Sequence, residues 1–117
     1  MPKVFGLHEI ELPSGVTAEE YEHFGKELAS IPTYEGWKIH LLKGDRGERA
    51  GKFLLLFEIE SIEARDRFYP TPSEASEEAR RFWEQHPEAT AVLEKYAGFL
   101  HEPHRETDYL VVGSAPR

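Results

Sequence analysis

Residues 53–57 are five consecutive apolar side chains, and this run constrains the fold more than any other feature of the chain. Successive side chains of a strand point to opposite faces of a sheet, so the run predicts a strand that is covered on both sides. Ile59 extends one of these faces, which favours a strand in the sheet interior. One layer of helices covers only one face, so the other face requires a second cover.

The chain has 117 residues, which fits a single domain, and its 39% hydrophobic and 12% aromatic residues supply enough apolar material for a core. We predict one domain over residues 1–113 and a loose tail over residues 114–117. The absence of cysteine excludes disulfides, thiolate metal ligands and cysteine nucleophiles. The first residues do not resemble a signal peptide, so we expect a cytoplasmic protein.

The net charge of the chain limits the kinds of partner that it can bind. The chain has 22 acidic and 14 basic residues and a formal net charge of -8, which opposes binding to phosphate backbones and anionic membranes. No apolar run approaches the roughly 20 residues that cross a bilayer. We therefore predict neither nucleic acid nor a membrane as a partner. The sequence lacks asparagine and has a single glutamine, Gln85, and this depletion of heat-labile residues favours a thermophilic source.

Apolar periodicity predicts the order of the elements. Strands are expected over residues 4–12, 37–43, 53–59 and 107–112. Helices are expected over residues 18–31, 62–69 and 74–99. Thr17 with Glu20 forms a capping box for the first helix, and Ser61 and Ser73 are the expected caps of the other two. Pro87 is expected to end or redirect the last helical stretch.

This order is the split β-α-β pattern of a ferredoxin-like α+β fold, with an antiparallel sheet, helices on one face and strands one and three in the centre. The face expected under the helices carries Phe5, Leu7, Trp37, Ile39, Leu41, Phe53, Leu55, Phe57 and Ile59. The opposite face is expected to carry Val4, His8, Ile10, His40, Leu42, Leu54, Leu56 and Glu58. That second face is too apolar to remain in water, and a second copy of the chain is the expected cover, giving a homodimer.

Two segments carry a resemblance to a known superfamily. Residues 31–37 look like the loop that joins the first helix to the second strand in dimeric alpha-beta barrel proteins, and residues 57–64, followed by Phe68, are similar to the exit from their third strand. By its layout, over nearly the whole chain, the sequence resembles this superfamily, whose members include antibiotic-biosynthesis monooxygenase-like, EthD-like and haem-degrading proteins. The resemblance implies a homodimer that binds a small aromatic or polyketide-like compound between sheet and helices. It also implies cofactor-independent oxygenation or isomerisation.

His8, His40 and Glu58 are expected on one face of three strands, as candidate catalytic residues. A carboxylate beside an imidazole in a partly dry pocket holds the ring in one tautomer and raises its basicity, as proton abstraction from an acidic carbon or a phenol requires. The alternative is a purely structural polar rim, or a hydrogen-bonded pair inside the dimer interface.

The cleft between sheet and helices is the second candidate site, and the resemblance implies it. Its expected lining is Tyr21, Phe24, Trp37, Trp83 and Tyr109, with His86 as a further catalytic candidate. Trp83 and His86 share a helix face, and haem-degrading members also use a tryptophan and a histidine. Those members need an asparagine on the first strand, which this chain lacks, so no haem or other cofactor is expected. Aromatic residues at helical spacing are also typical of an ordinary core.

His101 and His104 offer two imidazoles to a metal, but Pro103 prevents a regular helical arrangement and exposed loop histidines are usually not ligands, so no metal is predicted. Two hypotheses remain. The first is a small-molecule-binding protein, with monooxygenase or isomerase activity implied by the resemblance. The second is a non-catalytic homodimeric accessory protein in which the histidines serve only structure.

Overall fold

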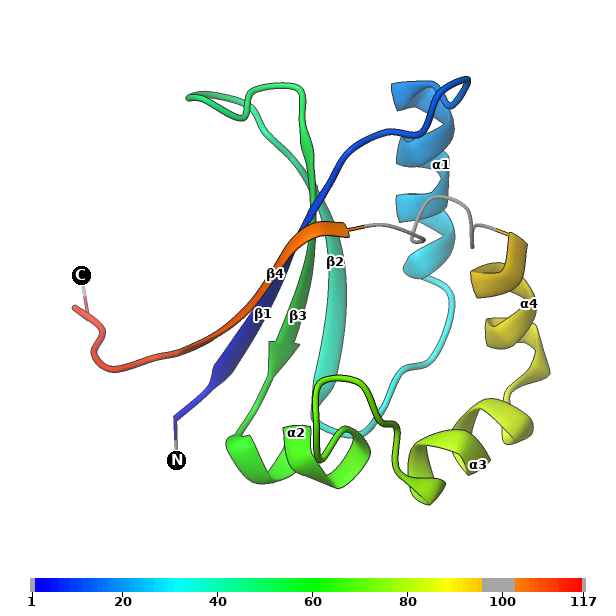
Figure 1. The fold of residues 1–117 in the computed structure, drawn as a ribbon, viewed down its shortest axis with the longest axis vertical. Helices are drawn as coiled ribbons and strands as arrows, with labels where there is room; N and C mark the ends of the chain where they lie inside the picture. The colour runs from blue at the N-terminus through cyan, green and yellow to red at the C-terminus, as the bar shows by residue number, and fades with distance from the viewer. Residues whose placement is uncertain (1, 96–102, 117) are drawn as a thin grey trace.

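The computed structural model describes residues 2–95 and 103–116 (Figure 1). In chain order, the elements are β1 (Val4–Ile10), α1 (Ala18–Leu28), β2 (Trp37–Lys43), β3 (Phe53–Ile59), α2 (Ile62–Phe68), α3 (Glu77–Gln85), α4 (Pro87–Lys95) and β4 (Pro103–Leu110). This confirms the predicted α+β class. No helix among these residues is long and apolar enough to cross a membrane.

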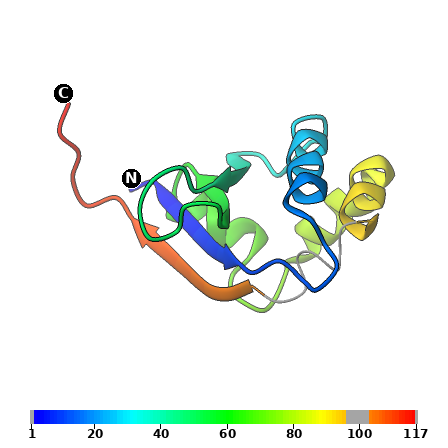
Figure 2. The ribbon, with the colours of Figure 1, turned by 90° about the horizontal axis from the view of Figure 1, so that it is seen from above.

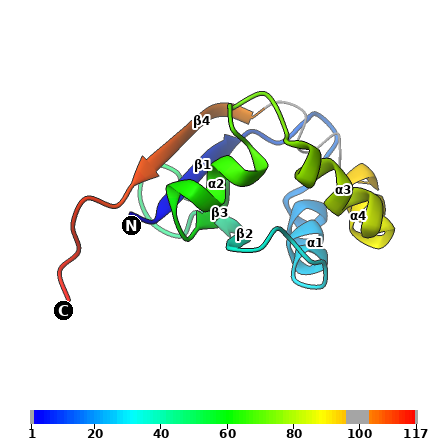
Figure 3. The ribbon, with the colours of Figure 1, turned by 90° about the horizontal axis from the view of Figure 1, so that it is seen from below.

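The strands form one antiparallel sheet in the order β2-β3-β1-β4, so β1 and β3 are the central pair, as predicted. Figures 2 and 3 show α1, α3 and α4 together on one side of this sheet. The short helix α2 is fixed to the same side, because the indole Nε1 of Trp37 on β2 donates a hydrogen bond to the carbonyl oxygen of Ala64 at 3.0 Å.

Two of the predicted caps are present and one is wrong. Thr17 accepts a hydrogen bond from the backbone amide of Glu20, and Ser61 caps α2. The cap of α3 is Ser76, whose hydroxyl accepts from Ala79 at 3.2 Å, rather than Ser73. Pro87 opens α4, a position where proline is tolerated because the first helical amide has no partner within the helix.

The limits of β2 and β3 agree with the prediction, whereas other limits differ. β1 ends at Ile10, two residues early, and α1 ends at Leu28. The last strand was predicted over residues 107–112 but spans Pro103–Leu110. The earlier start is important for the site, because it adds Glu106 to the strand.

The faces predicted for β1 are the wrong way round. Val4 pairs with Ile59, His8 with Leu55 and Ile10 with Phe53, and directly paired residues share a face. Val4, Gly6, His8 and Ile10 therefore face the helices, while Phe5 and Leu7 lie on the open face. A one-residue shift moves every side chain of a strand to the other face, and β1 has apolar residues on both.

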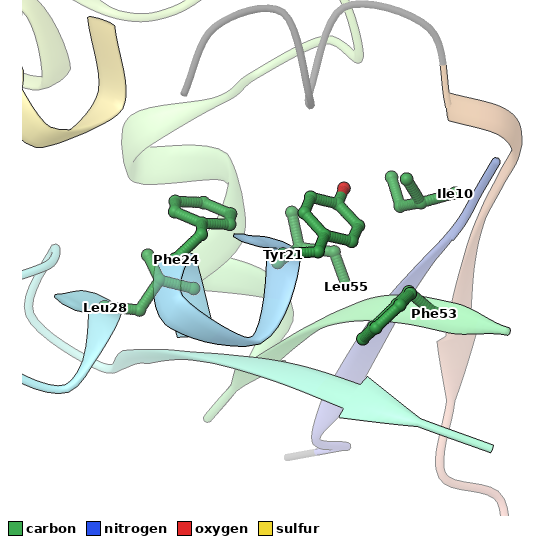
Figure 4. Packing of buried hydrophobic residues seen from close by; sticks show 6 residues of the cluster. All are labelled: Ile10, Tyr21, Phe24, Leu28, Phe53 and Leu55. Atoms are coloured by element: carbon green, nitrogen blue, oxygen red, sulfur yellow. The ribbon is translucent and has the colours of Figure 1, made fainter. Parts of the chain in front are cut away.

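The core lies between α1 and the two central strands (Figure 4). Its buried members are Ile10, Tyr21, Phe24, Leu28, Phe53 and Leu55. The ring of Tyr21 meets that of Phe53 edge-on with 4.8 Å between centroids. Burial raises the pKa of Tyr21 to about 12, so its hydroxyl stays neutral at physiological pH.

Phe53→Ala tests this core. The side chain of Phe53 is only 2% exposed, so its truncation leaves a cavity and is expected to lower the free energy of unfolding by about 3–5 kcal/mol, measured by urea denaturation. Val112→Ala is the control, because Val112 is 99% exposed and its change is expected to stay within about 0.5 kcal/mol. A similar small loss for Phe53→Ala would contradict the core placement.

Candidate functional site

A cavity of about 650 Å³ lies between the helices and the inner face of the sheet. Its apolar walls include Phe24, Leu28, Trp37, Ile39, Leu55, Phe57, Ile59, Trp83 and Leu93. Its polar lining comes from His8, Thr33, Arg65, Asp66, Glu106 and Asp108, among others. The described residues therefore form a pocket that is apolar along its walls and charged where β1 and β4 meet α2.

Gly6 explains why the cavity reaches the floor of the sheet. On the inner face it lies between Phe57 and Asp108, its partners on β3 and β4. A Cβ atom at this position would lie 3.0 Å from Oδ1 of Asp108 and 3.5 Å from Cβ of Phe57. A larger side chain on this central strand would push into the space that the cavity occupies.

His8 is the imidazole of this cavity. Across the strand pair it lies opposite Glu106, with 3.6 Å between its Nδ1 atom and Oε1 of the carboxylate, and its ring centroid is 4.9 Å from that of Phe57. Burial lowers the pKa of His8 below its ordinary value of 6.5, and the charges of Glu106 and Asp108 oppose this shift only in part. His8 is therefore mainly neutral at pH 7 and able to accept a proton.

Arg65 joins α2 to the edge strand β4 at the same end of the cavity. Its guanidinium donates to Asp66 at 3.0 Å and to Asp108 at 3.2 Å. The hydrogen bond to Asp66, with the charges of both carboxylates, raises the pKa of Arg65 above its ordinary value. The guanidinium of Arg65 thus holds the side chains of Asp66 and Asp108 in place, and all three residues line the cavity.

A cluster of aromatic rings fixes the wall on the helix side. Tyr34 stacks on Phe68 with 4.3 Å between centroids, and the indole Nε1 of Trp83 donates to the hydroxyl of Tyr34 at 2.7 Å. Burial is the main cause that raises the pKa of Tyr34, so this hydroxyl remains a neutral hydrogen-bonding group. The hydroxyl oxygen of the neighbouring residue Thr33 is buried and has no hydrogen-bond partner among the described residues. A buried hydroxyl without a partner is unfavourable unless something else satisfies it.

Some of the predicted cleft residues belong to this cavity and others do not. Phe24, Trp37 and Trp83 line it. Tyr21 is a core residue and Tyr109 lies across the sheet on the open face, opposite Phe5.

His86 is also outside the described lining. Its Nδ1 atom lies 2.7 Å from the backbone carbonyl of Phe82, and its ring stacks on the Phe82 ring with 4.2 Å between centroids. These contacts fix the end of α3 and leave His86 without a place in the pocket.

The predicted group of His8, His40 and Glu58 is divided between the two faces. His40 and Glu58 are 3.2 Å apart on the open face, where Lys3 also donates to Glu58 at 3.0 Å. The hydrogen bonds from Lys3 and then His40 lower the pKa of Glu58. His8 faces the helices, so it does not join this pair. The carboxylate beside His8 is Glu106, which the sequence analysis did not identify.

Arg65, Asp66, Glu106 and Asp108 are the site residues that sequence reasoning missed. One signal was present in the sequence. Glu106 and Asp108 are two residues apart in a segment that leads into an apolar strand, and residues at this spacing in a strand lie on the same face of the sheet. That strand was predicted to begin at residue 107, which excluded Glu106.

The suggested metal ligands gain no support. His101 lies outside the described residues, and for His104 only the backbone is described. Among the side chains that the structure describes, over residues 2–95 and 105–116, no group of three or more histidine, cysteine or acidic residues is placed to hold a metal ion. Comparison with known proteins adds no assignment, because no family model, curated protein or solved structure matches this chain.

The titration of His8 tests the electrostatics of the cavity. By NMR, its midpoint is expected below 6.5, and Glu106→Gln is expected to lower it further because the carboxylate favours the charged ring. As the pH falls below 6.5, the imidazole of His8 takes up its proton in the unfolded chain before it does so in the folded chain. The free energy of unfolding therefore decreases on acidification, and the contribution of His8 is retained at higher pH. A midpoint above 6.5, or one that rises in Glu106→Gln, would contradict the arrangement.

Proposed function

We propose that this protein binds a small, largely apolar organic molecule in the cavity between sheet and helices. The cavity itself carries the proposal: its volume of about 650 Å³ falls in the range of about 300–1,000 Å³ that is typical of ligand sites, and its walls are apolar with polar groups at one end. The imidazole of His8 and the carboxylates at that end support an occupant with a hydrogen-bonding group.

His8 is the proposed proton acceptor. It is neutral at pH 7, and the carboxylate of Glu106 lies on its Nδ1 side and favours the charged ring once a proton has been accepted. An isomerase needs such a group, which removes a proton from an acidic carbon and returns it at another position. The resemblance to dimeric alpha-beta barrel proteins adds cofactor-independent oxygenation of a small aromatic or polyketide-like compound as a second chemistry for the same site.

The accessory-protein hypothesis requires a cleft that its own side chains fill. Trp37, Phe57 and Trp83 instead line the cavity, and Phe82 packs against Tyr34 and His86. This arrangement favours the ligand-binding proposal.

We also propose that the chain forms a ferredoxin-like homodimer through the open face of its sheet. This face carries the apolar side chains of Phe5, Leu7, Leu42, Leu54, Leu56 and Tyr109. No described helix packs on it. Charged pairs flank it: Glu58 with Lys3 and His40 at one end, and Glu9 with Arg49 and Arg105 at the other. An apolar band between balanced charges suits a two-fold partner with the same surface.

Binding is tested with 2-naphthol, a flat probe with one hydroxyl, by fluorescence titration and by the shift in Tm. Saturation near 100 times Kd is expected to stabilise the protein by about 2.7 kcal/mol. His8→Ala is expected to weaken binding about tenfold through the loss of one hydrogen bond. His86→Ala is the matched control and should leave binding unchanged.

If 2-naphthol does not bind, the proposal that the cavity is a ligand site is contradicted. Equal losses in His8→Ala and His86→Ala would remove His8 from the site. The two results are independent, because the first concerns the cavity and the second concerns its polar end.

The dimer is tested by light scattering across a dilution series. We expect a dimer, and Leu56→Lys is expected to give a folded monomer because it places a charge in the centre of the apolar band. Val112→Lys is the control, because Val112 is fully exposed and lies after β4. A stable monomer in the unaltered chain would overturn the dimer and leave the cavity in place.

A further inference from the structure

The polar end of the cavity is rich in negative charge. Its described lining holds the carboxylates of Asp66, Glu106 and Asp108 and the single guanidinium of Arg65. With His8 neutral, these groups sum to two negative charges. The chain as a whole has a formal charge of -8, so its long-range field acts in the same direction.

Arg65 does not offer an open site for an anionic ligand. It already donates to Asp66 at 3.0 Å and to Asp108 at 3.2 Å. A ligand carboxylate that binds the remaining N–H donors of this guanidinium would lie beside the carboxylates of Asp66 and Asp108. This position is unfavourable, because like charges repel.

Glu106 is in the opposite situation. It has no lysine or arginine partner among the described residues. Its neighbour in the pocket is the imidazole ring of His8, with 3.6 Å between Nδ1 of the ring and Oε1 of the carboxylate. Glu106 is therefore able to accept a hydrogen bond from a positively charged ligand group without first losing an ion pair.

The aromatic wall favours the same kind of ligand. Trp37, Tyr69 and Trp83 line the cavity, and the electron-rich faces of such rings attract cations within about 6 Å. An ammonium group also has three N–H donors for the carboxylates at the polar end.

We infer that the cavity selects an aromatic or aliphatic ligand that carries a protonated amine, and discriminates against the corresponding carboxylic acid. This inference rests on the proposed ligand-binding function and specifies its substrate class. A neutral alcohol of the same shape is accepted with intermediate affinity, because it neither gains the attraction nor suffers the repulsion.

Three probes with the same ring system test the inference: 2-naphthylmethylamine, 2-naphthylmethanol and 2-naphthoic acid. Their Kd values are measured at pH 7 by fluorescence titration at low and physiological salt. The amine is expected to bind at least tenfold more tightly than the acid, with the alcohol between them. The preference should narrow as salt rises, because the charges at the pocket entrance are partly exposed.

Two charge-neutral variants locate the effect. Glu106→Gln and Asp108→Asn are each expected to reduce the ratio of acid Kd to amine Kd by about threefold or more. Asp45→Asn is the matched control, because it removes one charge from a carboxylate that is 95% exposed in the loop between β2 and β3, outside the cavity lining. It should leave the ratio unchanged.

The outcomes separate this inference from the proposed function. Equal binding of the three probes, or tightest binding of the acid, overturns the charge selection and leaves the binding cavity standing. If Asp45→Asn and Glu106→Gln reduce the preference for the amine equally, the preference comes from the acidic surface as a whole. This result also overturns the charge selection by the cavity. Binding by none of the probes removes the proposed function and this inference together.

Discussion

The pairing of β1 with β3 determines most of what is distinctive in this structure. Val4 and Ile10 fill the inner face at the two ends of β1, where they meet Ile59 and Phe53. Between them, Gly6 and His8 present little apolar volume, so the helices cannot close onto the centre of the sheet. The cavity thus follows from which residues of β1 face inward. In the opposite register, Phe5 and Leu7 would occupy that space.

This pairing also explains which parts of the fold were predictable from the sequence. β2 and β3 have regular apolar patterns between turn residues, so their limits were found correctly. The faces of β1 were not, because Phe5 and Leu7 are as apolar as Val4 and Ile10, and only contacts with β3 select between them. The cap of α3 was misplaced for a local reason: a turn linking Thr71 to Glu74 takes up Ser73, and Ser76 is the serine that remains to cap the helix.

The candidate site also has one part that could be predicted from the sequence and one part that could not. Its aromatic wall was predictable in part, because Phe24, Trp37 and Trp83 lie at positions whose periodicity marks an inward face. Its polar end was not, because it depends on contacts between distant parts of the chain. Arg65 and Asp108 are 43 residues apart in sequence, and Glu106 meets His8 only through the pairing of β4 with β1.

The polar end contains two opposing influences on His8, and a ligand changes their balance. Burial lowers the pKa of His8, whereas the carboxylates of Glu106 and Asp108 raise it, and burial is the larger influence. A cationic ligand beside these carboxylates offsets their charge and displaces water, and both effects favour the neutral imidazole. With the proposed cationic ligand bound, these carboxylates would therefore favour protonation of His8 less. The ring would stay neutral but would be a weaker base than in the empty cavity, whereas an anionic ligand would raise its basicity.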